Sequence, residues 1–208
     1  MIRAICICAL LLCAAPAAAQ CDDLASLRKS AAMGKLSDET TSCLAQTLVA
    51  GTLMTREQAS NLLVANSFAK GDHYAWAGHV EFHLESINTS DCDLMFKYGQ
   101  HLLKNDAPAA AVKWAESAEK HSYGWPAEKR DDKLQDLHRL KTKGMWAVYE
   151  SLAADGGMKQ RAALGQVQLA SVEWMREAKK KERDTTEALD FCIRSGWTRE
   201  RCEQQAAL

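Results

Sequence analysis

The chain repeats itself at an offset of 34 residues, and this period constrains its fold more than any other feature. The stretches 60–85 and 94–119 align at this offset, with small or apolar residues and one lysine recurring at matched positions. The aligned pairs are Ala65 with Gly99, Phe68 with Leu102, Lys70 with Lys104, Ala77 with Ala111, and Leu84 with Ala118. A fixed period of this length indicates structural repeats that stack on one another, because a single repeat cannot bury its own apolar face.

A period of 34 residues is that of the tetratricopeptide repeat (TPR), a pair of antiparallel helices joined by a short turn. In such a hairpin the eighth position, on the first helix, faces the twentieth position, on the second helix, and small side chains let the helices approach closely. These positions hold Ala65 and Ala77 in one unit, and Gly99 and Ala111 in the next. The pattern predicts an all-α fold of TPR-like hairpins stacked as a short right-handed solenoid. An unrelated bundle of α-hairpins is the alternative.

The rest of the chain also favours helices. Prolines occur only at positions 16, 108 and 126, and alternating apolar runs separated by Gly or Asn turns, which are typical of strands, are absent. Thr55 with Gln58, and Asp184 with Glu187, have the spacing of a capping box and predict helix starts.

These signals divide the chain into four regions. We expect a signal peptide over 1–19, an irregular N-terminal cap unit over 20–54, two TPR-like repeats over 55–125, and a long helical hairpin followed by disulfide-closed helices over 126–208. The sequence Asp155-Gly156-Gly157 is expected to separate the two long helices of the hairpin. Two short helices on either side of Ser195-Gly196 are expected to close the chain.

The first region has the composition of a secretory signal peptide. Arg3 precedes an apolar run over 4–15, and three alanines at 17–19 form a small-residue cleavage site. No later segment reaches the run of about 18 apolar residues that crosses a membrane. We therefore expect an exported, periplasmic protein. A lipid anchor on Cys21 is the alternative, although bulky Gln20 stands where lipoprotein signals carry a tiny residue.

The net charge argues against nucleic acid as an obligatory partner. The full chain carries −1, and loss of Arg3 with the signal peptide changes this to −2. Nucleic-acid-binding domains usually carry a strongly basic surface. The basic run REAKKKER (176–183) fits the solvated end of a long helix.

Export gives the cysteines a structural role, because disulfides persist in oxidising compartments. Cys192 and Cys202 flank a short hairpin and predict one disulfide. Cys21 and Cys43 predict a second, provided that the first helix is short or bent, because two straight helices would separate their Cα atoms by more than about 7 Å. Cys92 is then left over. The other three of the eight cysteines leave with the signal peptide: Cys6, Cys8 and Cys13.

Four stretches resemble a group of exported TPR proteins from myxobacteria and their relatives, which includes a TPR lipoprotein of the gliding-motility machinery. They are MGKLSDETTSCL (33–44), NSFAKGDHYAWAGHVEFHLESINTSD (66–91), VKWAESAEKHSYGW (112–125) and RDTTEALDFC (183–192). The resemblance implies an α-helical repeat fold, a location in the cell envelope and a scaffolding role without catalytic residues. The chain departs from this group in its lipoprotein signal and in the presence of Cys92.

His79 and His83 are the strongest candidates for a metal site, since zinc proteases use two histidines at this spacing. Such an enzyme needs a glutamate directly after the first histidine, but Glu81 lies two residues on, about 200° around the helix from His79. The repeat register places both histidines on the outer face, with Ala77 and Leu84 turned inward. No GxSxG, CxxC or phosphate-binding loop occurs. We therefore expect a non-catalytic scaffold with no enzymatic activity, no cofactor and no metal. The alternatives are a structural subunit of an envelope complex that acts through its whole surface and a metal-binding protein that uses His79 and His83.

The first helix of each hairpin lines the concave wall of a TPR stack, and its outward positions form the predicted partner-binding groove. Lysines, amides and one aromatic ring suit an extended acidic segment or a carboxylate terminus of another envelope protein. We expect Lys70 and Lys104 to stack in one column, with ordinary solvated polar residues as the alternative. Among the tryptophans, Trp125 is expected to be an exposed anchor, because it lies in an insertion. The groove residues are Asn66, Lys70, Phe96, Lys97, Gln100 and Lys104.

Overall fold

The computed structural model describes residue 21 and residues 23–152 and 157–208. The predicted signal peptide at 1–19 lies outside these residues. The described residues form ten α-helices and one 3-10 helix and contain no strand, so the all-α prediction is confirmed. Helix contacts divide the chain into an N-terminal unit that ends at His79 and a C-terminal unit that begins at Val80.

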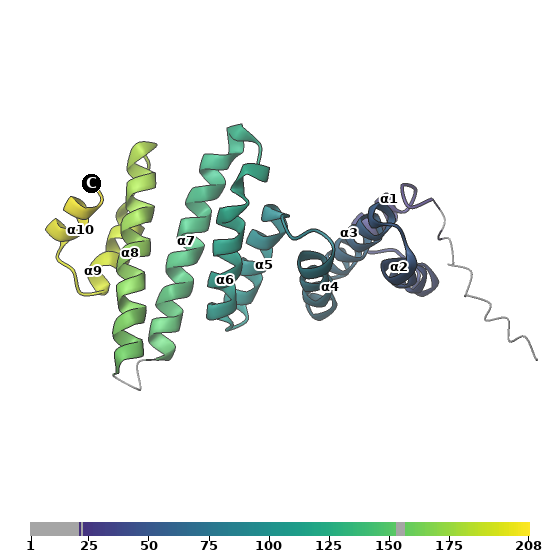
Figure 1. Cartoon of the computed structure of the whole chain (residues 1–208), viewed down its shortest axis with the longest axis horizontal. Helices are drawn as coiled ribbons and strands as arrows, with labels where there is room; N and C mark the ends of the chain where they lie inside the picture. Colours follow the sequence, from purple (N-terminus) through teal and green to yellow (C-terminus); the bar gives the residue numbers. More distant parts are fainter. Residues whose placement is uncertain (1–20, 22, 153–156) are drawn as a thin grey trace, which may run out of the picture. The chain divides into compact units, whose positions relative to one another are not determined.

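The N-terminal unit is built around its longest helix, α3, which packs against both α1 and α2 (Figure 1). Its helices are α1 (Arg28–Ala32), α2 (Asp38–Ala50), α3 (Leu53–Lys70) and the first half of α4 (His73–Ser86). Aliphatic side chains from the first three helices and from the turn after α1 form the core. They are Ala31, Leu36, Leu44, Ala59, Leu62 and Leu63.

Side-chain caps set the ends of these helices. Ser37 and Thr52 precede α2 and α3, and each hydroxyl accepts a hydrogen bond from the backbone N–H three residues further on. Helix α3 therefore begins at Leu53, and the predicted start at Thr55 is wrong because Thr52 caps the helix first. At the other end of α3, Gly71 has a φ of +71°, the left-handed conformation that favours glycine.

In the C-terminal unit, the helices from α5 to α8 lie side by side in chain order (Figure 1). Helix α6 packs against both α5 and α7, and α7 packs against α8. The elements are α5 (Cys92–Lys104), α6 (Pro108–Lys120), the 3-10 helix η1 (Ser122–Gly124), α7 (Ala127–Ser151), α8 (Met158–Lys180), α9 (Thr186–Arg194) and α10 (Arg199–Gln205).

Small residues allow the close approach of α5 and α6 that the repeat pattern predicts. A Cβ atom placed on Gly99 would lie 3.3 Å from the carbonyl oxygen of Ala111 and 3.1 Å from Cδ2 of Leu140. Ala111 is fully buried. The predicted contact between Gly99 and Ala111 is thus confirmed, and a larger side chain at position 99 would force α6 outward.

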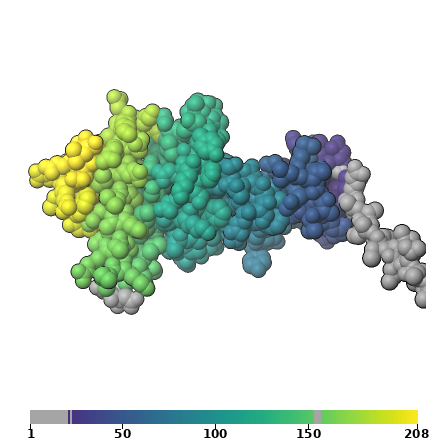
Figure 2. Space-filling model, viewed as in Figure 1, coloured from purple at the N-terminus to yellow at the C-terminus, as the bar shows by residue number. Residues whose placement is uncertain are grey.

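Helices α7 and α8 are the two long helices predicted for the C-terminal hairpin, with 25 and 23 residues. Part of the predicted connection, at 153–156, lies outside the described residues. The two short helices predicted around Ser195-Gly196 are α9 and α10. Figure 2 shows them in yellow on the surface of this unit beside α8, against which both pack. Their shared core consists of Val172, Trp174, Met175, Ala188, Leu189, Phe191, Cys192, Cys202 and Ala206.

Both predicted disulfides are present. Cys192 of α9 is bonded to Cys202 of α10, and Cys21 is bonded to Cys43 of α2 with 5.8 Å between the Cα atoms. The second bond is possible because α1 has only five residues and turns precede it, so no straight helix carries Cys21 away from α2. The two disulfides indicate an oxidising, exported environment.

Trp125 is buried, so the prediction of an exposed anchor is wrong. Its side chain packs edge-on against Phe96 of α5, with 6.4 Å between ring centroids, and only 3% of the residue is exposed. The ammonium group of Lys133 lies 5.4 Å from the centre of the same indole. The predicted open insertion instead forms η1 and the start of α7, and this path places the indole against α5.

Candidate functional site

A pocket of about 380 Å³ lies in the N-terminal unit, and α2, α3 and the start of α4 line it. Its lining residues recur at intervals of three or four along each helix, so each helix contributes one face. The volume is within the range of ligand sites in proteins. Of the predicted groove residues, Asn66 and Lys70 lie in its wall. The polar lining of the first two helices consists of Asp38, Thr41, Ser42, Asn66, Ser67 and Lys70.

Lys70 is the cation of this pocket. It is exposed, and in the described part of the chain it forms no ion pair. Asp38 and Asp72 also belong to the lining, and Asp72 caps α4 by accepting a hydrogen bond from the backbone N–H of Ala75 at 3.0 Å. The pocket can therefore bind a carboxylate through Lys70 and hydrogen-bond donors through its aspartates and hydroxyls.

Asn66 has a structural role in addition to its place in the pocket wall. It is buried, and its Oδ1 accepts a hydrogen bond from the backbone N–H of Leu36 at 3.1 Å. This bond satisfies a backbone donor in the turn after α1, which would otherwise be buried without a partner. Asn66 thus holds that turn against α3, a function that its predicted groove position did not suggest.

The two histidines of α4 do not lie on the outer face, so that part of the prediction is wrong. His79 is half-buried in the pocket wall, where its Nδ1 lies 3.3 Å from Oγ of Ser67. His83 is fully buried. Trp76, Val80 and His83 form one buried stripe of the helix at i, i+4 and i+7. Because one residue turns a helix by about 100°, a small change of register is enough to rotate His83 inward.

Burial lowers the pKa of His79 below its usual value, although a hydrogen bond with the backbone of Leu63 and the charge of Asp72 act in the opposite direction. The folded state therefore favours the neutral imidazole, whereas the unfolded chain takes up a proton below about pH 6.5. The contribution of His79 to the free energy of unfolding is therefore fully present above this pH. It is lost as the pH falls toward the lower pKa of the folded state. We expect urea unfolding to show this decrease, which should be less than about 1 kcal/mol because the ring is partly solvated. His79→Gln should remove it.

His73→Gln is the matched control for this measurement. His73 is an exposed residue at the start of the same helix, and the chemical change is identical. An equal change of pH dependence in both variants would contradict the assignment to His79.

The four predicted groove residues of α5 do not share one environment. Phe96 is buried in the C-terminal unit, so it offers no aromatic surface to a partner, contrary to the prediction. Lys97 is exposed but forms an ion pair with Asp93 at 2.8 Å. Gln100 and Lys104 are exposed, and Lys104 is the last residue of its helix.

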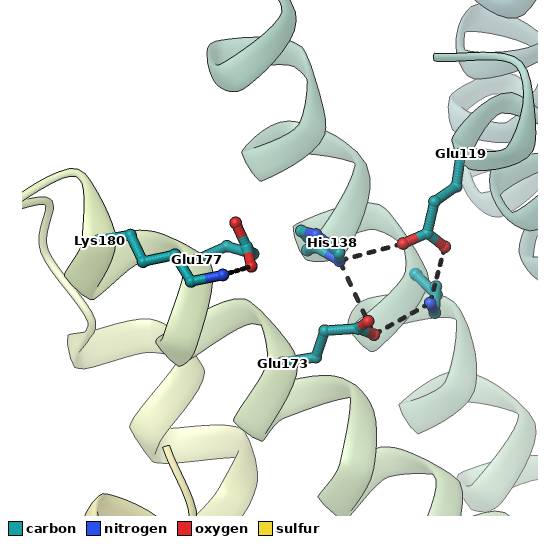
Figure 3. Close-up of polar contacts among 6 residues, drawn as sticks. Glu119, His138, Glu173, Glu177 and Lys180 are labelled. Atoms are coloured by element: carbon teal, nitrogen blue, oxygen red, sulfur yellow. Dashed lines mark hydrogen bonds and ion pairs between the residues drawn. The ribbon is translucent and has the colours of Figure 1, made fainter. Parts of the chain in front are cut away.

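A second polar cluster lies inside the C-terminal unit, where α6, α7 and α8 pack together (Figure 3). Glu119, His138 and Glu173 come from these three helices, and their side chains point toward one another. Lys141, almost one turn after His138, bonds to the two carboxylates at 2.9 and 3.2 Å. No local motif marks this cluster in the sequence, because its members are far apart in the chain.

Burial and ion pairing set the charges in this cluster. Burial outweighs the nearby carboxylates and lowers the pKa of His138, so its ring is neutral near pH 7. Burial alone would also lower the pKa of Lys141, but Glu119 and Glu173 outweigh it and raise that pKa above its usual value. The cluster therefore holds two carboxylates, one ammonium group and one neutral imidazole.

Cys92, which was predicted to lack a disulfide partner, is a free and buried cysteine. Burial raises the pKa of its thiol, and the charges of Asp91 and Asp93 raise it further, so the reactive thiolate is disfavoured. Its sulfur packs closely against Gly124, where an added Cβ atom would lie 3.2 Å away. Cys92 thus has a packing role, and a bridge to another chain through it would require local unfolding.

None of the described helices combines the length and apolar character needed to cross a membrane. Comparisons of the chain with protein-family models, with curated proteins and with solved structures found no match.

Proposed function

We propose that the protein is a non-catalytic scaffold of the bacterial cell envelope, in which TPR-like hairpins hold a segment of another protein. The 34-residue period, the small residues between α5 and α6 and the all-helical architecture support this arrangement. The disulfides and the composition of residues 1–19 support a periplasmic location. The resemblance to exported TPR proteins supports a place in a motility or secretion machine.

The pocket of the N-terminal unit is the observation that carries this proposal. It combines Lys70 with two aspartates and several hydroxyl groups in one hollow. An extended peptide presents both N–H and C=O groups, so it can bond to the aspartates and the hydroxyls together. An acidic side chain or a terminal carboxylate of the same peptide can pair with Lys70. The partner we propose is thus an extended, acidic segment of an envelope protein.

Membrane attachment through Cys21 is not part of this proposal. A sulfur atom cannot carry a thioether-linked lipid and a disulfide at once, and Cys21 is bonded to Cys43. The proposed mature form is therefore disulfide-bonded and carries no lipid on Cys21.

Lys70→Glu is expected to weaken partner binding by at least about tenfold, or about 1.4 kcal/mol, because it places a negative charge where the acidic segment binds. The immobilised protein would be used to capture partners from native envelope extracts, with quantification by mass spectrometry. Titration with the identified segment then gives the affinity.

Lys104→Glu is the matched control, since it makes the same charge change at another exposed lysine that ends a helix. Loss of capture with Lys70→Glu alone supports the pocket. Equal losses with both variants would instead favour the lysine column predicted from the repeat. Full capture by both variants would rule out a lysine-dependent site for an acidic segment.

A further inference from the structure

Three side chains with the chemistry of metal ligands converge between α6, α7 and α8 of the C-terminal unit (Figure 3). Nδ1 of His138 lies 3.9 Å from Oε1 of Glu119 and 4.0 Å from Oε2 of Glu173. One ligand atom from each residue lies within 4.8 Å of the other two. Since each residue belongs to a different helix, the packing of α7 against α6 and α8 holds the three in place.

His138 is a buried polar side chain that points into this cluster without a hydrogen bond. Only 5% of the side chain is exposed, and its distances to the two carboxylates exceed hydrogen-bonding range. No other group among the described residues forms a hydrogen bond with its ring. A metal ion between the three side chains would give the imidazole a direct partner.

Lys141 supplies the positive charge that the two glutamates face. Its Nζ lies 2.9 Å from Oε2 of Glu119 and 3.2 Å from Oε2 of Glu173, and 12% of its side chain is exposed. The ammonium group thus balances one of two negative charges and leaves the imidazole of His138 without a bond. A divalent ion would balance both carboxylates and bind the imidazole as well.

We propose that Glu119, His138 and Glu173 bind a first-row divalent transition-metal ion, with Zn²⁺ as the best match, and that Lys141 competes with this ion for the carboxylates. An imidazole ligand favours such ions over Ca²⁺ and Mg²⁺, which prefer oxygen ligands. Three protein ligands leave a fourth position of Zn²⁺ for water. This site goes beyond the proposed function and does not depend on the pocket of the N-terminal unit.

Binding of the ion requires movements of side chains but not of the helices that carry them. Ligand atoms around a tetrahedral Zn²⁺ ion are about 3.4 Å apart. The distances from His138 must therefore shorten by roughly half an ångström, and the two glutamate oxygens, which lie within 4.8 Å of each other, must approach by up to about 1.4 Å. The side chains of Glu119 and Glu173 are 28% and 44% exposed, so they can turn toward the ion and admit it from solvent. Lys141 can move its ammonium group away on its flexible four-carbon stem.

Isothermal titration calorimetry of the purified chain with Zn²⁺ tests this site. We expect the wild-type protein to bind one equivalent. Lys141→Met should bind at least about tenfold more tightly because the competing charge is removed, and Glu173→Gln at least about tenfold more weakly because a ligand is lost. Lys180→Met is the matched control. Lys180 pairs with Glu177 at 2.6 Å, outside the three ligands, so its loss should leave the affinity unchanged (Figure 3).

Co²⁺ gives a second readout, because its visible d–d bands respond to an imidazole in the coordination shell. The wild-type spectrum should show this response, and His138→Gln should lose it. Circular dichroism would establish that the variant keeps its helices. Glu173→Gln changes a partly exposed residue and keeps the test decisive even if His138→Gln fails to fold.

Two results would overturn the proposal. The first is a wild-type protein that binds no Zn²⁺, even if Lys141→Met does, because Lys141 would then be a permanent counter-ion in a structural network. The second is equal Zn²⁺ affinity of the wild type and Glu173→Gln, because the ion would then bind elsewhere on the chain.

Discussion

Replacement of Gly34 by valine is expected to lower the free energy of unfolding of the N-terminal unit by about 3 kcal/mol, through two effects that add. Gly34 has a φ of +67°, a conformation that costs an L-residue about 1–2 kcal/mol. An added Cβ atom would also lie 2.9 Å from the backbone nitrogen of Lys70 and 3.0 Å from the carbonyl carbon of Ala69. Neither atom can yield without a shift of the end of α3. Urea unfolding followed by circular dichroism measures the loss.

Gly71→Val separates backbone strain from close packing. Gly71 has a φ of +71°, but an added Cβ atom would meet no atom within 4 Å. Only the strain should remain, at about 1–2 kcal/mol. If the two variants were equally destabilised, the close packing of the turn after α1 against α3 would not contribute to stability.

Loss of the Cys192–Cys202 disulfide, as Cys192→Ala with Cys202→Ala, is expected to cost about 3 kcal/mol of unfolding free energy. The bond joins residues 10 positions apart, and the entropy of the unfolded loop accounts for about 2.7 kcal/mol. Both sulfurs are also fully buried in the core shared by α8, α9 and α10, so packing is lost as well. Helix α10 has only seven residues and is not stable by itself, so we expect it to detach first.

Two measurements test this expectation. Urea unfolding under oxidising conditions gives the total cost, and trypsin cleavage at the exposed Arg199 and Arg201 reports the detachment of α10. Cys92→Ala is the matched control, because it removes a buried cysteine that forms no disulfide. If the double variant resisted trypsin as well as the wild type, side-chain packing rather than the disulfide would hold α10.

Much of the helical architecture was predictable because its signals are local. The 34-residue period placed Gly99 opposite Ala111, and these residues are in close contact. Turn residues between apolar runs separated the two long and two short helices of the C-terminal unit. The pairing of Cys192 with Cys202 followed from the short segment between them. In each case, the residues that carry the signal lie within one hairpin.

The environments of individual side chains were less predictable, because they depend on the rotation of each helix about its axis. In α4 this rotation brings His79 into the pocket wall and buries His83, whereas the repeat register placed both outside. Phe96 and Trp125 pack on each other instead of facing a partner, because η1 and α7 replace the expected open loop. A shift of one residue is enough to turn a helix face by about 100°.

By itself, the sequence determined an all-α chain and the pairing of its cysteines, and both disulfides are present in the structure. Only the tertiary structure decided that Lys70 shares a pocket with residues of α2 and α4, and that Glu119, His138 and Glu173 meet. The pocket and the cluster each contain side chains from three different helices. Their meeting depends on which helices are neighbours, on how far each slides along the other and on its rotation, and no local sequence pattern encodes these quantities.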